Sequence, residues 1–354
     1  MGCCCRGVSL LTLVVTLLLS GCGQFGYYWQ AGKGQWSVLS SRQPIDSLLS
    51  ADSTDEILKL KLQHVQQFRQ FAEQQLLLES GGSYRHFVAL DDDYVVWNVY
   101  AAKPLSVESY QWCYPLLGCM GYRGYFQKSS AIAYAEQLAE EGLEVHVGGV
   151  TAYSTLGWFN DPVLSSFLGE NTLDLAALLF HELAHRKIYV RGDTAFNESF
   201  ATAVAHLGIA QWLATDRVAQ QDPAAFQHWQ RQQARASAFI ELLLEAREEL
   251  SAIYCSGRTV DGKLQAKDKA YLKLQTRYRQ YAEQWHYRGY DAWMADINNA
   301  QLATVGDYNL WLKSFEALYR QNPGDWQLFY QGVQQLAELP RKERVIELEL
   351  LKSR

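Results

Sequence analysis

The residues of this chain best suited to chemistry are two histidines four positions apart, His181 and His185, in the stretch HELAH. On a helix, positions i and i+4 share one face about one turn apart, so both imidazoles can reach one metal ion. Zinc–nitrogen bonds of about 2.0–2.1 Å require that closeness. Glu182 is rotated by roughly 100° from His181, so it would flank the ion instead of binding it. The spacing predicts a site for one zinc ion with a carboxylate beside it.

From that position Glu182 could act as a general base and then as a general acid. A catalytic zinc lowers the pKa of a coordinated water toward neutrality. A neighbouring carboxylate can take the proton and deliver it to a leaving amine. The chemistry that the H-E-x-x-H pattern predicts is therefore peptide-bond hydrolysis with one zinc ion as cofactor.

A catalytic zinc also needs a third protein ligand and one open position. Gly and His three and six residues after the second histidine would mark a metzincin, but Ile188 and Arg191 stand there. Asp193 lies in a predicted turn, where an aspartate more often caps a helix. Glu198 lies on the next predicted helix. We therefore expect Glu198 to complete a ligand set of two histidines and one glutamate.

Two helices must bring these groups together. The pattern predicts a helix over 172–187, which carries HELAH, and a second over 194–213, which carries Glu198. RGDT at 191–194 is typical of a turn, and Thr194 can cap the second helix. The two helices would form an antiparallel pair facing the metal. The small residues of SFATAVA, which begins directly after Glu198, would let them pack closely.

The first half of the chain contains strand-like segments, and the second half is almost wholly helical by its pattern. Strands are predicted over 94–102 and 121–126, and a strand, a glycine turn and a second strand over 143–157. The expected fold class is α+β, with a small N-terminal sheet and a mainly helical C-terminal half. YSTLG in the last strand would form an edge strand beside the HExxH helix and could pair with a peptide backbone. Further helices are predicted over 54–78, 130–141, 223–253, 265–285, 308–320 and 326–336.

The N-terminus is predicted to be a lipoprotein signal peptide. Arg6 precedes VSLLTLVVTLLL, an apolar run of about twelve residues that is too short to span a bilayer. The run ends in LSGC, which resembles a bacterial lipobox and would make Cys22 the lipidated first residue. Gly23 favours, by resemblance, the outer membrane. Residues 1–21 would then be removed, and 22–44 would form a lipidated tether on the periplasmic side. The rival pattern MGCCCR resembles a myristoylation signal but has arginine where Ser or Thr is needed.

Length, composition and cysteines bound the remaining possibilities. The chain has 354 residues, 48% of them hydrophobic, and a net charge of −6, which fits a single domain over 45–354 whose sheet-containing half ends near 170. No basic patch stands out, so no nucleic-acid partner is expected. Cys113 and Cys119 lie close together in CYPLLGC. In an oxidising periplasm they could form a disulfide, and two buried thiols are the alternative.

Four stretches together resemble a family of bacterial predicted zinc aminopeptidases, whose members are often lipoproteins. The resemblance covers nearly the whole mature chain, through AYSTLGWFNDP, FHELAHRKIYVRGDTAFNESFAT, WCYPLLGCMGYRGYF and NNAQLATVGDY. It implies that His181, His185 and Glu198 bind the metal and that Glu182 is the catalytic acid and base. The resemblance also implies peptide substrates and attachment to a membrane through the N-terminal lipid.

The sequence leaves the position of cleavage open. An aminopeptidase must hold the α-ammonium of its substrate, usually with a carboxylate, and the Gly-x-Met-x-Asn strand of the well-known gluzincin aminopeptidases is absent. Asp161 is a candidate anchor, although NDP is also a turn sequence. Tyr153 and Tyr308 are candidates for stabilising the oxyanion with their hydroxyls. His206 is a further candidate, with a structural role as its alternative. Endopeptidase activity is the alternative to aminopeptidase activity.

A non-enzymatic protein is the alternative from another class. The long charged helices of the second half could make the chain a periplasmic scaffold or chaperone lipoprotein. Structural zinc is normally closed by four protein ligands, whereas three are predicted here beside a glutamate placed for proton transfer. A zinc metallopeptidase that acts as an aminopeptidase is therefore the expected function.

Overall fold

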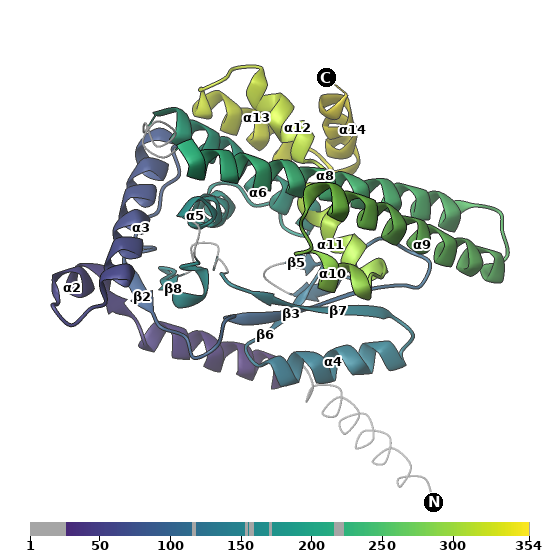
Figure 1. Ribbon diagram of the computed structural model, residues 1–354, viewed down its shortest axis with the longest axis horizontal. Helices are drawn as coiled ribbons and strands as arrows, with labels where there is room; N and C mark the ends of the chain where they lie inside the picture. Colours follow the sequence, from purple (N-terminus) through teal and green to yellow (C-terminus); the bar gives the residue numbers. More distant parts are fainter. Residues whose placement is uncertain are drawn as a thin grey trace, which may run out of the picture.

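The computed structural model describes residues 26–114, 118–152, 155, 159–169, 172–215 and 223–353. Two residues with predicted roles, Cys22 and Tyr153, lie outside that part of the chain. Figure 1 shows small sheets in the first half of the chain and a mainly helical second half, which confirms the predicted mixture of helices and strands.

The helices occupy most of the described chain. The two that carry the HELAH histidines and Glu198 are α5 (Thr172–Lys187) and α6 (Thr194–Thr215). The helix predicted over 308–320 corresponds to α12, which begins later, at Leu312. Residues 308 and 309 instead end α11, a helix that the sequence did not predict. The other α-helices are α2 (Ile45–Ser50), α3 (Glu56–Gln75), α4 (Lys128–Glu140), α8 (Pro223–Cys255), α9 (Val260–Trp285), α10 (Asp291–Ala295), α11 (Asn299–Asn309), α12 (Leu312–Arg320), α13 (Trp326–Glu338) and α14 (Arg341–Lys352).

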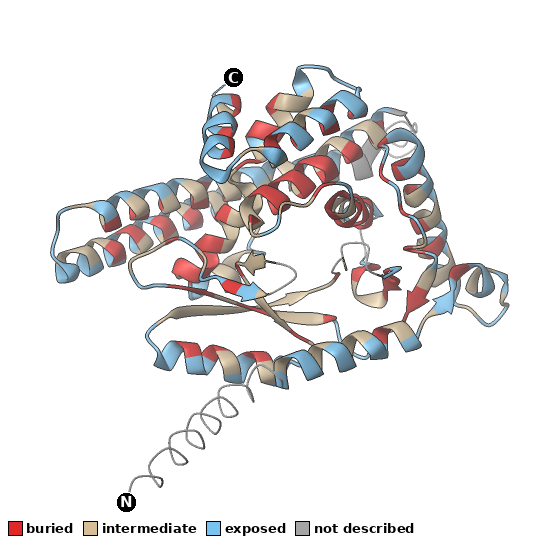
Figure 2. Cartoon of the chain, turned by 180° about the vertical axis from the view of Figure 1, so that it is seen from behind, coloured by how far each residue is buried: buried red, intermediate tan, exposed pale blue. Residues whose placement is uncertain are grey.

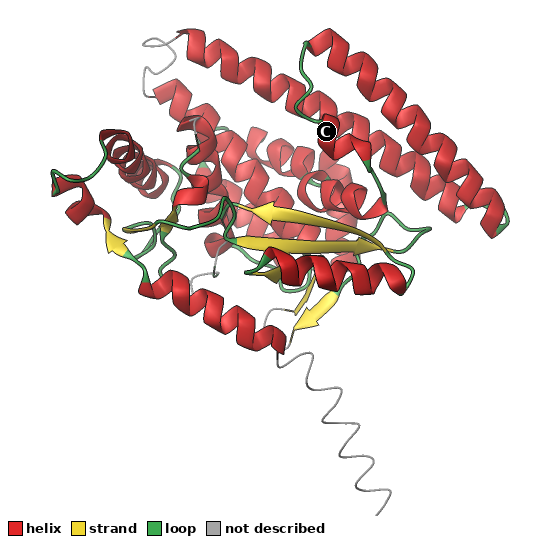
Figure 3. Cartoon of the chain, turned by 60° about the horizontal axis from the view of Figure 1, so that its bottom comes forward, coloured by secondary structure: helices red, strands yellow, loops and turns green. Residues whose placement is uncertain are grey.

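The sheet nearest the site has three antiparallel strands in the order β6 (Arg123–Tyr125), β3 (Val96–Ala102) and β7 (Glu144–Val150). Helix α4 packs on one face and α11 on the other, and Figure 3 shows α4 in front of the sheet with the helical half behind it. The predicted glycine turn in β7 is wrong, because Gly149 pairs with Trp97 inside an unbroken strand. A Cβ built at Gly149 would lie 2.4 Å from the Tyr94 ring, so the glycine admits a close side chain instead of reversing the chain.

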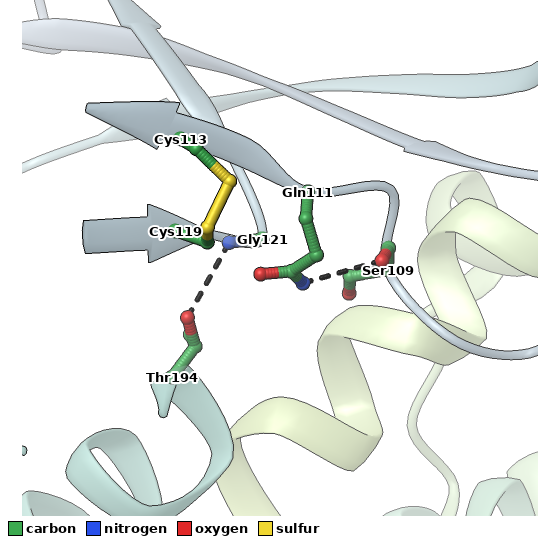
Figure 4. The surroundings of a disulfide bond; sticks show 6 residues. All are labelled: Ser109, Gln111, Cys113, Cys119, Gly121 and Thr194. Atoms are coloured by element: carbon green, nitrogen blue, oxygen red, sulfur yellow. Dashed lines mark hydrogen bonds between the residues drawn. A yellow bond between two sulfur atoms is a disulfide. The ribbon is translucent and has the colours of Figure 1, made fainter. Parts of the chain in front are cut away.

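A second three-stranded sheet is formed by β1 (Gln43–Pro44), β2 (His86–Val88) and β8 (Val163–Leu164). A separate hairpin of β4 (Trp112–Tyr114) and β5 (Gly118–Met120) holds a disulfide between Cys113 and Cys119, which pair directly across it. Figure 4 shows that the backbone N–H of Gly121, just after β5, donates to Thr194 Oγ1 at 3.3 Å. The disulfide hairpin is thereby attached to the first residue of α6.

The main core surrounds α5 and α6. Phe180 of α5 and Phe196 and Phe200 of α6 are fully buried, and Figure 2 shows α5 almost wholly buried between its neighbours. Burying each such side chain stabilises the folded chain by roughly 1.5–3 kcal/mol relative to leaving it exposed. Since both helices belong to one core, the residues of their facing surfaces are held firmly relative to each other.

The chain enters the fold earlier than the sequence predicted. Residues 26–40, within the segment expected to be a tether, form a helix that packs beside β6. The Gln30 side chain accepts from Phe126 N at 3.1 Å and donates to Gly124 O at 3.5 Å. A Cβ on Gly34 would lie 2.1 Å from the Phe126 ring, so this glycine allows the close approach. The helix therefore satisfies backbone groups beside an edge strand, a contact that local periodicity does not reveal.

Candidate active site

The side chains of His181, His185 and Glu198 converge on one point between α5 and α6. His181 Nε2 lies 3.3 Å from Glu198 Oε2 and 3.2 Å from His185 Nε2. His185 Nε2 lies 3.5 Å from Glu198 Oε2. A tetrahedral ion with bonds of about 2.0–2.1 Å needs ligand atoms about 3.3 Å apart. The three residues, which form the one such group found in the described part of the chain, could therefore bind a metal ion.

The turn between α5 and α6 sets the depth at which Glu198 enters. Gly192 adopts a φ of +78°, and Asp193 Oδ1 caps α6 by accepting from Phe196 N at 3.2 Å. The Asn197 side chain makes two hydrogen bonds to the backbone of Val190: its Oδ1 accepts from Val190 N at 2.7 Å, and its Nδ2 donates to Val190 O at 2.8 Å. Of the two capping candidates from the sequence, Asp193 caps α6, whereas Thr194 is the first residue of the helix. This capped turn places Glu198 one helical turn into α6, facing α5.

Glu182 and Glu198 have different electrostatic surroundings although both are buried. Burial raises the pKa of Glu182, against the opposing charges of His181 and His185. Burial alone would also raise the pKa of Glu198, but His185 and His181 outweigh it and hold that pKa well below its ordinary range. Glu198 is thus an ionised carboxylate in contact with two imidazoles, whereas Glu182 is the better proton acceptor of the two.

A cavity of about 630 Å³ opens beside this group, within the range of volumes found for ligand sites. Glu182 lines it together with the three possible metal ligands. The edge strand β7 reaches the cavity through its last residue, Val150. Thr155, the described residue of the predicted YSTLG strand, lines the cavity outside any strand. The rest of YSTLG lies outside the described residues.

Three tyrosines line the cavity close to the metal group. Tyr308, a candidate from the sequence, stacks on His181 with ring centroids 6.2 Å apart. Tyr122 and Tyr189 line it as well, although the sequence did not single them out. Burial raises the pKa of all three tyrosines, and the Glu198 charge raises it further. Their hydroxyls are therefore protonated at neutral pH and can donate hydrogen bonds.

Two other candidates from the sequence, Asp161 and His206, are not among the described residues that line the cavity. The Asp161 carboxylate accepts from Thr155 N at 3.1 Å and from Thr155 Oγ1 at 2.7 Å. These bonds fix a loop beside the cavity. His206 Nδ1 lies 3.5 Å from Glu316 Oε1, and both side chains are partly exposed.

Comparison with known families adds an independent observation. Residues 26–348 match the model of a family described as "Putative aminopeptidase". The chain belongs to this family. The match begins at Gly26, so it includes the described helix 26–40 as well as the metal group. The family description indicates peptidase activity. No curated protein and no solved structure gave a match.

Proposed function

We propose that the protein is a zinc-dependent aminopeptidase. The observation that supports this most directly is the spacing of His181, His185 and Glu198 beside an open cavity. Two imidazole nitrogens and one carboxylate oxygen form a donor set that suits zinc, and three protein ligands leave a fourth position for water or substrate. Structural zinc is normally closed by four protein ligands, so this arrangement favours catalysis over a purely structural role.

The residues around the cavity divide the chemistry among them. Zinc, when bound, would polarise the scissile carbonyl and activate a water molecule. Glu182 would accept a proton from the attacking water and pass it to the leaving amine. Tyr308 can donate a hydrogen bond from its hydroxyl to the oxygen that gains negative charge during the reaction. Glu198 stays ionised and so keeps negative charge beside the two imidazoles.

Endopeptidase activity is the second candidate, because an aminopeptidase needs a group that binds the substrate's α-ammonium. Among the described residues that line the cavity, the carboxylates are Glu182 and Glu198, both already assigned to the chemistry. The experiment is to measure the zinc content of the purified chain and its activity on matched peptides with free and acetylated amino termini. Cleavage of free termini alone supports an aminopeptidase, and equal cleavage of both supports an endopeptidase. If the purified chain bound no zinc and hydrolysed no peptide after zinc was added, the result would support the scaffold alternative.

We also propose that the protein is a lipoprotein, attached through Cys22 to the bacterial outer membrane and facing the periplasm. The outer face of helix 26–40 supports this. Trp29 and Trp36 lie two turns apart on that face and are 68% and 72% exposed. Among the described tryptophans, these two are the exposed ones. Tryptophan side chains favour the membrane–water interface. Among the described helices, none is long and apolar enough to cross a membrane.

The attachment can be tested in cells by labelling with a fatty-acid analogue and separating the two membranes on a density gradient. The native chain should carry the label and sediment with the outer membrane. Cys22→Ser should lose the label and leave the outer-membrane fraction. If Cys22→Ser retained both properties, the proposed anchor would be wrong.

A further inference from the structure

Helix 26–40 forms part of the wall of the cavity that contains the metal group. Tyr27, Tyr28, Ala31 and Gln35 line it, and their spacing places them on one face of the helix. In Figures 1 and 2 this helix lies across from α5. Since α5 carries two of the possible metal ligands, a peptide bound between the two elements would touch both the reactive groups and the N-terminal helix.

The Tyr27 ring is held in place by several contacts. The Arg123 guanidinium lies 4.0 Å from the ring centroid, a distance typical of a cation–π interaction. The Tyr114 ring stacks on Tyr27 with centroids 5.9 Å apart, and the two hydroxyls are 3.3 Å apart. Tyr114 follows Cys113 directly, so the disulfide hairpin supports this part of the wall. A side chain that packs here meets a preformed surface, which lowers the entropy cost of binding.

We define the aromatic wall as Tyr27, Tyr28, Tyr114, Met120 and Phe126, all of which line the cavity. These side chains come from helix 26–40, the disulfide hairpin and the residue after β6. Each offers aromatic or thioether surface, which packs well against aromatic and large aliphatic groups.

The charges around the cavity support the same substrate class. Every described lining residue outside the group of His181, Glu182, His185 and Glu198 is neutral. A charged substrate side chain against the aromatic wall would lose water, and none of the five side chains of the wall carries an opposite charge to offset that free-energy cost. An aromatic or large aliphatic side chain would instead bury apolar surface there.

We propose that the aromatic wall is a substrate subsite that takes a large apolar or aromatic side chain of the peptide. Peptides with Phe, Trp or Leu beside the scissile bond are then hydrolysed in preference to otherwise identical peptides with Asp or Lys. This inference rests on the proposed peptidase function and names its substrate class.

The test uses two neighbouring residues of helix 26–40 in the full zinc-loaded chain in detergent. Tyr28 is 48% exposed and lines the cavity, whereas Trp29 is 68% exposed and is not among the lining residues. Tyr28→Ala should lower kcat/KM for Phe and Leu peptides by about 2- to 10-fold, mainly through KM, with little change for Ala peptides. Trp29→Ala should leave both unchanged. Tyr28→Phe, which keeps the ring, should retain the preference for Phe over Ala peptides that Tyr28→Ala loses.

Three results would overturn the subsite: a native preference for Asp or Lys peptides, an equal loss in Tyr28→Ala and Trp29→Ala, or an equal loss on Phe and Ala peptides. Calorimetric titration of Glu182→Gln with the same peptides separates this proposal from the proposed function. Tighter binding of Phe peptides that is weakened by adding Tyr28→Ala supports the subsite even if no peptide is hydrolysed by the native chain. Binding without side-chain preference contradicts it.

Discussion

The phenol ring of Tyr308 lies nearly parallel to the imidazole of His181, with an interplanar angle of 15° and centroids 6.2 Å apart. Tyr308 stands in the last turn of α11, and His181 stands on α5. The contact joins two helices that are far apart in the sequence and brings a hydroxyl donor into the cavity of the metal group. This geometry makes Tyr308 the tyrosine to test first.

Tyr308→Phe should keep the ring stack and the metal but lower kcat by about 10²- to 10³-fold, because it removes one donor to the developing oxyanion. KM should change little, since the hydroxyl would act mainly in the transition state. Steady-state kinetics and zinc content measure the two effects. Tyr122→Phe and Tyr189→Phe are the matched controls. A full loss in either control with normal activity in Tyr308→Phe would assign the donor to the other tyrosine.

Glu182→Gln should retain zinc and lose most turnover, by about 10²- to 10⁴-fold, because the amide cannot accept the proton of the attacking water. His185→Ala should lose both zinc and turnover, since it removes one of three ligands. Metal analysis beside peptide hydrolysis separates the two cases. Full hydrolysis by Glu182→Gln would rule out the proposed proton transfer.

Asp307 should make stability depend on pH. Burial raises the pKa of its carboxyl to about 7, from an ordinary value of 3.8, although Ser109 Oγ donates to it at 2.6 Å. Because the pKa of Asp307 is higher in the folded chain than in the unfolded chain, the protonated carboxyl favours folding. Its full contribution to the free energy of unfolding is present below pH 3.8 and is lost as pH rises toward 7. The loss amounts to at most about 4 kcal/mol.

Asp307→Asn should remove that dependence. Urea unfolding between pH 4 and pH 8 should therefore show the variant gaining stability relative to the native chain as pH rises, with a plateau above about pH 7. Taking the difference between the two proteins cancels the titration of groups that they share. Parallel stability curves over this range would mean that the Asp307 carboxyl titrates normally.

The disulfide should contribute to stability through the unfolded chain. Cys113 and Cys119 are six residues apart, and closing so short a loop stabilises a protein by about 2 kcal/mol in the chain-entropy treatment. Replacing both cysteines with alanine should lower the free energy of unfolding by about that amount. Denaturant melts under oxidising conditions measure it. Dithiothreitol should lower the stability of the native chain and not that of the double variant. Equal sensitivity of the two would contradict the prediction.

The sequence by itself determined the elements that carry the metal group. His181 and His185 share a helix face because they are four residues apart, and this depends only on the helical period. The bounds of α5 and the start of α6 followed from local apolar patterns and capping residues, so the approach of Glu198 could be predicted. The sequence was wrong about β7, where it predicted a glycine turn. The strand is unbroken there, and a glycine is needed at position 149 because the Tyr94 ring lies over it.

Only the tertiary structure decided what surrounds that group. Tyr27 and Tyr28 belong to a segment that looked like a tether, and they line the cavity because helix 26–40 packs beside β6. Tyr122 and Tyr189 are two of 21 tyrosines, and no local pattern distinguishes them. Their positions depend on contacts between residues far apart along the chain. Helical and strand periodicities report only which face of an element is buried, so such contacts follow from the packing of the whole fold.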